Sequence, residues 1–91
     1  MLSINTMPFL LPKKVTQENA LQLQKEGLLN SPSLRSIDCS ELNDFDSTVL
    51  TVLLAWQKTL MTEGQSISLA HVPEKLKVLA GVYGVNVLLG L

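Results

Sequence analysis

Residues 48–63 are mostly apolar and contain no glycine or proline. Asp46 and Ser47 directly precede this segment, and both are residue types that favour helix starts. Gly64 follows it, and glycine is common where helices end because it readily adopts a left-handed conformation. The pattern therefore predicts a helix over residues 48–63, and this helix constrains the rest of the fold more than any other segment does.

The apolar side chains of this predicted helix are spread widely around its axis. At 100° per residue they cover an arc of about 200°, whereas a helix that covers one core usually has an apolar stripe of about 100°. Val49, Val52 and Trp56 lie on one side of the arc, and Leu50 and Leu54 lie on the adjoining side. We expect part of the arc to pack on the protein's own sheet and the remainder to contact a partner.

Alternating apolar and polar residues predict three strands around this helix, because side chains of a half-buried strand point alternately to two faces. These strands are residues 20–27, 36–40 and 66–72. A second helix is expected over residues 73–83 and a short edge strand over 85–89, whereas residues 1–17 show no defined element. This order favours one α/β domain over residues 1–91, with a mixed β-sheet covered by helices.

Composition and charge argue against several classes of function. The net charge is −1 and the seven Lys and Arg residues are scattered, which leaves little basis for binding nucleic acid. His71 is the single histidine, and no group of His, Cys, Asp and Glu residues has the spacing of metal ligands. The sequence also lacks a glycine-rich phosphate loop. We therefore expect no enzyme activity, no metal and no cofactor.

The sequence also predicts a compartment. Cys39 is the only cysteine and lies in an apolar strand-like run, which suits a buried thiol in a reducing environment. Lys13 and Lys14 follow the apolar N-terminal residues instead of preceding them, the reverse of a secretory signal. The apolar runs are shorter than the roughly 20 residues that a membrane-spanning helix needs. We therefore expect a cytoplasmic protein.

The residues around the start of the predicted helix carry a resemblance to a known family. Phe45, Asp46, Ser47, Thr48 and Leu50 resemble the signature of STAS domains, in which a hydrophobic residue, an aspartate and hydroxyl residues open the second helix. The similarity continues over residues 65–85 and is greatest to the small MlaB-like accessory subunit of Mla-type phospholipid ABC transporters.

This sequence departs from the family pattern in two places. Val49 stands where the family usually has glycine, and its side chain would narrow the access of a partner backbone. The interval between the first two predicted strands, residues 28–36, is too short for the first family helix. We therefore expect that helix to be absent or shortened.

The resemblance implies a non-catalytic accessory subunit that binds the ATPase subunit of a bacterial phospholipid-transporting ABC complex and supports its assembly or activity. Such a subunit is cytoplasmic and reaches the inner membrane only indirectly, through the complex, and a homodimer is compatible with it. The alternative is an anti-sigma factor antagonist that is switched by phosphorylation at Ser47, because antagonists of this family are phosphorylated at the matching serine.

We expect partner contacts along the predicted helix, with Trp56 as the anchor because aromatic residues dominate the energetics of interfaces. The predicted contact residues are Asp46, Ser47, Thr48, Val49, Thr51, Val52 and Trp56. Two other interpretations stay open. Trp56 can be a core residue, and Asp46 or Ser47 can cap the helix without a further role.

Overall fold

The computed structural model describes residues 8–29 and 34–91, and it confirms the α/β class. The elements in chain order are β1 (Phe9–Leu10), β2 (Lys14–Val15), α1 (Ala20–Leu29), β3 (Ile37–Asp38), β4 (Asp44–Phe45), α2 (Thr48–Met61), β5 (Leu69–Ala70) and α3 (Glu74–Val82). Strands β1, β3 and β5 form one sheet with β3 in the centre, and β2 pairs with β4 in a second sheet. The strand pairs in this part of the chain are all parallel.

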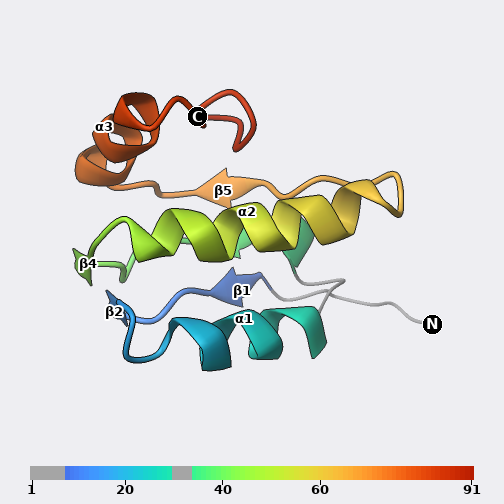
Figure 1. The fold of residues 1–91 in the computed structure, drawn as a ribbon, viewed down its shortest axis with the longest axis horizontal. Helices are drawn as coiled ribbons and strands as arrows, with labels where there is room; N and C mark the ends of the chain where they lie inside the picture. Colours follow the sequence, from blue (N-terminus) through green and yellow to red (C-terminus); the bar gives the residue numbers. More distant parts are fainter. Residues whose placement is uncertain (1–7, 30–33) are drawn as a thin grey trace.

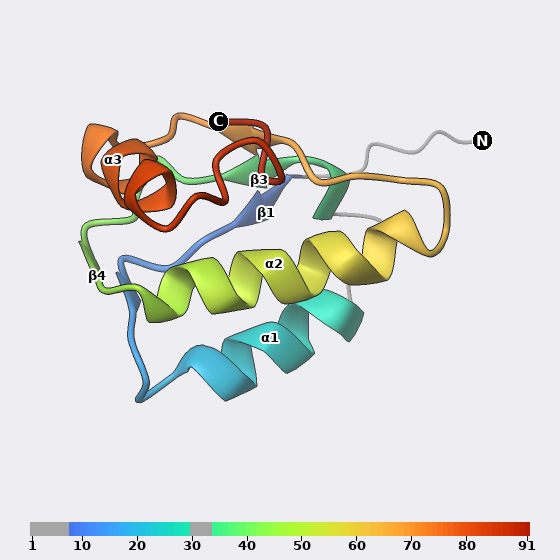
Figure 2. The ribbon, with the colours of Figure 1, turned by 45° about the horizontal axis from the view of Figure 1, so that its top comes forward.

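The helices lie around the larger sheet in the arrangement of Figure 1. Helix α2 crosses the face of the sheet, α1 lies beside it near β1, and α3 lies beyond β5. The turned view in Figure 2 shows α1 and α2 next to each other on the same face, in agreement with the contacts between these two helices. The core lies between this helix pair and the sheet, and its largest fully buried side chain is Trp56.

The strand predicted over residues 20–27 is wrong, because these residues belong to α1. The alternation of Leu21 with Leu23 extends over only four residues and does not reflect burial, since Leu21 is 66% exposed. The buried residues of α1 are Leu23 and Gly27, which are four positions apart and therefore lie on one face of a helix. The first helix, expected to be absent or shortened, is thus present as α1, and the strand before it in the larger sheet is β1.

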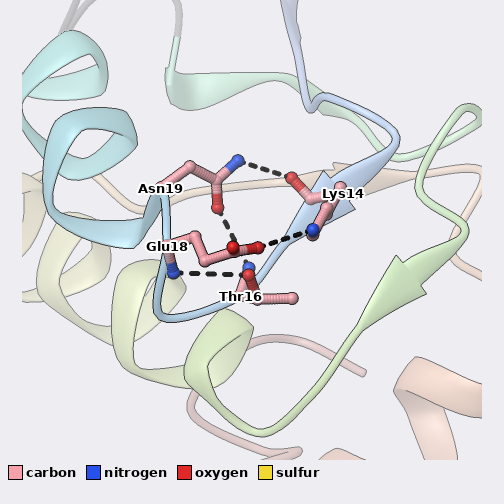
Figure 3. A network of polar contacts seen from close by, with 4 residues as sticks. All are labelled: Lys14, Thr16, Glu18 and Asn19. Atoms are coloured by element: carbon pink, nitrogen blue, oxygen red, sulfur yellow. Dashed lines mark hydrogen bonds and ion pairs between the residues drawn. The ribbon is translucent and has the colours of Figure 1, made fainter.

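A network of polar contacts fixes the start of α1 (Figure 3). The Thr16 backbone N–H donates to Asn19 Oδ1 at 3.0 Å, and the Glu18 backbone N–H donates to Thr16 Oγ1 at 3.3 Å. This pattern resembles a capping box in which asparagine replaces the usual glutamate or glutamine, although Thr16 Oγ1 accepts from the N–H of Glu18 and not from that of Asn19. Asn19 Nδ2 also donates to the Lys14 carbonyl oxygen at 2.7 Å, and Lys14 and Glu18 form an ion pair of 2.6 Å. Strand β2 and helix α1 are therefore joined by a defined turn.

The predicted helix over residues 48–63 is confirmed as α2, and its end has the expected form. The Gln65 N–H donates to the Leu60 carbonyl oxygen at 2.9 Å and the Gly64 N–H donates to that of Met61 at 3.1 Å, while Gly64 has a φ of 73°. These are the bonds of a Schellman motif. The wide apolar arc has an internal explanation, because α2 packs against both the sheet and α1. Much of the surface assigned to a partner is therefore covered within the chain.

The second half of the chain follows the prediction except at its end. Strands β3 and β5 lie within the predicted segments 36–40 and 66–72, and α3 lies within 73–83. The edge strand predicted over residues 85–89 is wrong, because this segment forms a helical turn in which the Leu89 N–H donates to the Val85 carbonyl oxygen at 3.1 Å. Val85 is partly buried and Leu89 is buried, so their spacing of four residues fits this turn as well as it fits a strand.

The N-terminal segment is more structured than the sequence pattern indicates. Residues 1–7 of the predicted undefined segment 1–17 lie outside the described residues. Phe9–Leu10 and Lys14–Val15 form strands β1 and β2, and the residues around them do not alternate between apolar and polar in the way that predicts a strand. Strand β2 pairs with β4, and the Lys13 carbonyl oxygen accepts hydrogen bonds from the N–H groups of Asn43 and Asp44 at 2.9 and 2.8 Å. The loop before α2 is therefore held by the N-terminal segment.

Candidate functional site

Asp46 caps the start of α2. Its Oδ1 atom accepts a hydrogen bond from the Thr48 backbone N–H at 2.8 Å, and its carbonyl oxygen accepts one from the Val49 N–H at 3.1 Å. Hydrogen bonds from the Thr48 hydroxyl group and from the Thr48 backbone N–H lower the pKa of the Asp46 carboxyl group. The carboxylate also lies where the positive end of the helix dipole favours a negative charge. Asp46 therefore has a structural role at this position.

Ser47 is the residue next to the helix, but its side chain makes no capping hydrogen bond. Because the Asp46 carboxylate takes the capping role, the Ser47 hydroxyl group is left for another interaction. Ser47 and Thr48 are partly buried, and Thr51, one helical turn further on, is exposed. Three hydroxyl groups are thus presented along the first turn of α2.

Strand β4 directly precedes the start of α2 and helps to position it. Phe45 is buried, and the Lys75 Nζ atom lies 4.9 Å from the centre of its ring, within the range of a cation–π interaction. Lys75 belongs to the first turn of α3, so this contact connects α3 to the residue that precedes the Asp46 cap. The segment that leads into α2 is therefore contacted by both β2 and α3.

A hollow of about 180 Å³ opens beside two of these hydroxyl residues, Ser47 and Thr51. It is lined by Ser47, Leu50, Thr51, Leu54, Tyr83 and Val85. Tyr83 follows α3 and is 58% exposed, and the chain reverses after it at Gly84, which has a φ of 71°. Sequence reasoning did not identify Tyr83 or Val85 as site residues. The only sequence signal for them is Gly84, which ends α3 and brings both residues to α2.

The structure separates the seven predicted contact residues into two groups. Asp46, Ser47, Thr48 and Thr51 lie together at the surface. Val49, Val52 and Trp56 are 0%, 1% and 0% exposed, so their prediction as contact residues is wrong. Val49, which stands where the family pattern has glycine, places its side chain in the core and does not narrow the exposed surface.

Trp56 is a core residue that contacts both α1 and β1. Its Nε1–H group donates to the Gln24 carbonyl oxygen of α1 at 3.0 Å, and its ring meets that of Phe9 edge to face with the centroids 5.2 Å apart. Gly27 of α1 lies directly against the same ring. The prediction failed because residues 20–27 were expected to form a strand, which left Trp56 without the helix that covers it.

Asp38 and Cys39 are two further candidate reactive groups, at the end of β3 and directly after it. Burial, and to a smaller extent the charge of Asp38, raises the pKa of the Cys39 thiol to about 11, so the reactive thiolate is disfavoured. Two hydrogen bonds from Ser40 lower the pKa of the Asp38 carboxyl group, and the bond from the Ser40 backbone N–H has a larger effect than that from its hydroxyl group. Within residues 8–29 and 34–91, no group of three or more His, Cys, Asp or Glu side chains is placed to hold a metal ion. None of the helices within these residues has the length and the hydropathy that a membrane-spanning helix requires.

The arrangement is suited to binding another molecule. Comparison with protein families found that the model described as "Mlab, STAS domain" matches residues 13–90. The match includes the capped start of α2, all three helices and Tyr83. A search of curated proteins found no match to this chain.

Proposed function

The chain belongs to the STAS domain family of the MlaB type, and from this premise we propose that it is an accessory subunit that binds the ATPase of a bacterial phospholipid-transporting ABC complex. STAS domains are in general binding domains without enzymatic activity. The proposed role is to support the assembly or activity of the ATPase. The proposed location is cytoplasmic, with contact to the inner membrane only through the complex.

The observation that carries this proposal is the surface at the start of α2. The Ser47 hydroxyl group has no capping hydrogen bond, Thr51 is exposed beside it, and the apolar residues Leu50 and Leu54 line the adjoining hollow. Polar groups at the rim of a partly apolar depression are typical of a protein interface. Because β2, β4 and α3 hold the loop before α2, this surface is formed before a partner arrives, which lowers the entropic cost of binding.

Ser47, Thr48, Thr51 and Tyr83 are the proposed contact residues. Asp46 contributes indirectly, because its carboxylate orients the backbone of Thr48 through the 2.8 Å hydrogen bond. The buried residues Val49, Val52 and Trp56 support this surface from the core and are not proposed to touch the partner.

Affinity purification of the tagged, full-length chain from its native host tests this proposal. We expect an ATP-binding-cassette ATPase to be the main co-purifying protein. The test variant is Thr51→Arg, which adds a long charged side chain at an exposed position of the proposed surface and should fold normally. We expect it to reduce the recovery of the ATPase. Recovery of the same ATPase in equal amounts with wild type and Thr51→Arg would exclude this surface, and recovery of no ATPase with wild type would exclude the function.

A second candidate function is an anti-sigma factor antagonist controlled by phosphorylation of Ser47. The free Ser47 hydroxyl group at the start of a helix favours it, because helix N-termini stabilise phosphate groups. Two carboxylates lie close by in sequence, Asp44 and Asp46, and they would repel a phosphate. Mass spectrometry of the protein purified from its host distinguishes the functions. A phosphate on Ser47 together with recovery of a sigma-regulating kinase would support the antagonist.

A further inference from the structure

A larger hollow, of about 470 Å³, follows the second half of α2. Leu54, Gln57, Lys58, Met61 and Thr62 line it from the helix, and Leu88 lines it from the C-terminal turn. Its volume is within the range of small-molecule sites, about 300–1,000 Å³. It shares Leu54 with the smaller hollow at the start of α2 but contains none of the proposed ATPase contact residues.

The neutral polar groups in this wall are already bonded within the protein. Gln57 Nε2 donates to the Leu88 carbonyl oxygen at 2.7 Å, and Gln57 Oε1 accepts from the Ile67 N–H at 2.8 Å. The Thr62 hydroxyl group donates to the Thr59 carbonyl oxygen at 2.6 Å. The wall offers a ligand mainly apolar surface, since Met61 is 58% and Leu88 is 53% exposed.

Lys58 is the charged member of this lining. Among the residues that the structure describes, the Lys58 ammonium group forms no ion pair with an acidic side chain. None of the lining residues is acidic. The hollow therefore combines an apolar wall with one unpaired positive charge, and this combination is complementary to an amphiphile with a negative head group.

We propose that this hollow binds a single-chain fatty acid, with its alkyl chain against Leu54, Met61 and Leu88 and its carboxylate paired with Lys58. The unbranched side chain of Met61 adapts to chains of different shape. The site is independent of the function proposed above, because it needs no ATPase.

Chain length and charge should affect the affinity in different ways. Each added methylene group should strengthen binding by up to about fourfold until the hollow is filled, as expected from about 0.8 kcal/mol for each buried methylene. The carboxylate should bind roughly two- to fivefold more tightly than the alcohol of equal length, because an exposed ion pair contributes up to about 1 kcal/mol.

The test is titration of the full chain with decanoate and decyltrimethylammonium below their micelle concentrations, and with decanol below its solubility limit. Calorimetry gives the affinity, and amide chemical shifts from two-dimensional NMR give the location. We expect decanoate to bind most tightly and to shift the amides of residues 54–62 and of Leu88. Lys58→Gln should weaken decanoate binding two- to fivefold and leave decanol binding unchanged, whereas Lys77→Gln, at an exposed lysine of α3 outside the hollow, should change neither.

Three results would overturn the proposal. They are absence of saturable decanoate binding, amide shifts that lie away from the hollow, and equal decanoate affinities for Lys58→Gln and wild type. Equally tight binding of decyltrimethylammonium would also contradict the assigned role of Lys58. Each of these readouts is independent of whether an ATPase binds the chain.

Discussion

Replacing Gly27 with alanine would place a methyl group where the Trp56 ring lies. A Cβ atom at Gly27 would be 2.3 Å from Trp56 Cε2 and 2.4 Å from Nε1, whereas carbon atoms in contact are normally about 3.5–4.0 Å apart. Either α1 must move away from α2 or the indole ring must rotate. Rotation would break the 3.0 Å hydrogen bond from Trp56 Nε1 to the Gln24 carbonyl oxygen.

The change in the free energy of unfolding combines one stabilising contribution with two destabilising ones. Alanine in place of glycine favours a helix by about 1 kcal/mol. Overpacking a core costs about 1–3 kcal/mol, and a buried donor left without an acceptor costs about 1–3 kcal/mol. We therefore expect Gly27→Ala to lower the free energy of unfolding by about 1–5 kcal/mol, which corresponds to a fall in Tm of at least about 4 °C in a domain of this size.

Urea denaturation followed by far-UV circular dichroism measures this effect without relying on Trp56 fluorescence. The matched control is Gly81→Ala in α3, where a Cβ atom would have no neighbour within 4 Å, and there we expect a gain of about 0.4–1 kcal/mol. In a Trp56→Phe background, the cost of Gly27→Ala should fall by at least about 1 kcal/mol, because the smaller ring removes the overlap. A Gly27→Ala protein as stable as wild type would refute the packing described for α1 and α2.

Two further predictions concern the core. Trp56→Ala should lower the free energy of unfolding by about 3–5 kcal/mol, measured by urea denaturation, because Trp56 is fully buried; a change below 1 kcal/mol would restore it as a surface anchor. Cys39 should resist alkylation in the folded protein and react on unfolding. Folding raises the pKa of the Cys39 thiol from 9.0 to about 11. The protonated thiol's contribution to the free energy of unfolding should therefore be complete below pH 9 and be lost as the pH rises towards 11. Cys39→Ala should remove that part of the pH dependence, and an unchanged pH profile would contradict it.

The elements that could be predicted from the sequence are those with long patterns and clear end signals. Helix α2 has an aspartate cap, fourteen helical residues without glycine or proline, and Gly64 at its end. Helix α1 was missed because four alternating residues resemble a strand, and because its cap uses Asn19 in place of glutamate or glutamine. Strands β1, β2 and β4 were missed because the residues around them do not alternate between apolar and polar, and parallel pairing with distant segments creates these strands.

The positions of the candidate contact residues could be predicted where they depend on local sequence, and not where they depend on tertiary contacts. The Asp46 cap and the hydroxyl groups of Ser47, Thr48 and Thr51 follow from a contiguous motif at a helix start. The burial of Trp56 depends on α1, and the position of Tyr83 beside α2 depends on α3, whose last turn it caps. Neither can be deduced from the helix that carries the motif, since each requires a second element of the fold.

The most direct test of the proposed function is the amount of ATPase that co-purifies with two arginine variants of matched chemistry. Thr51→Arg alters the exposed surface beside Ser47, whereas Ser66→Arg alters an exposed residue beyond the other end of α2, a helix about 21 Å long. With circular dichroism confirming that both variants are folded, we expect Thr51→Arg to reduce ATPase recovery at least about fivefold, the loss that corresponds to about 1 kcal/mol of binding free energy. Ser66→Arg should retain wild-type recovery. Wild-type recovery with folded Thr51→Arg, or equal losses with both variants, would contradict docking of the ATPase at the start of α2.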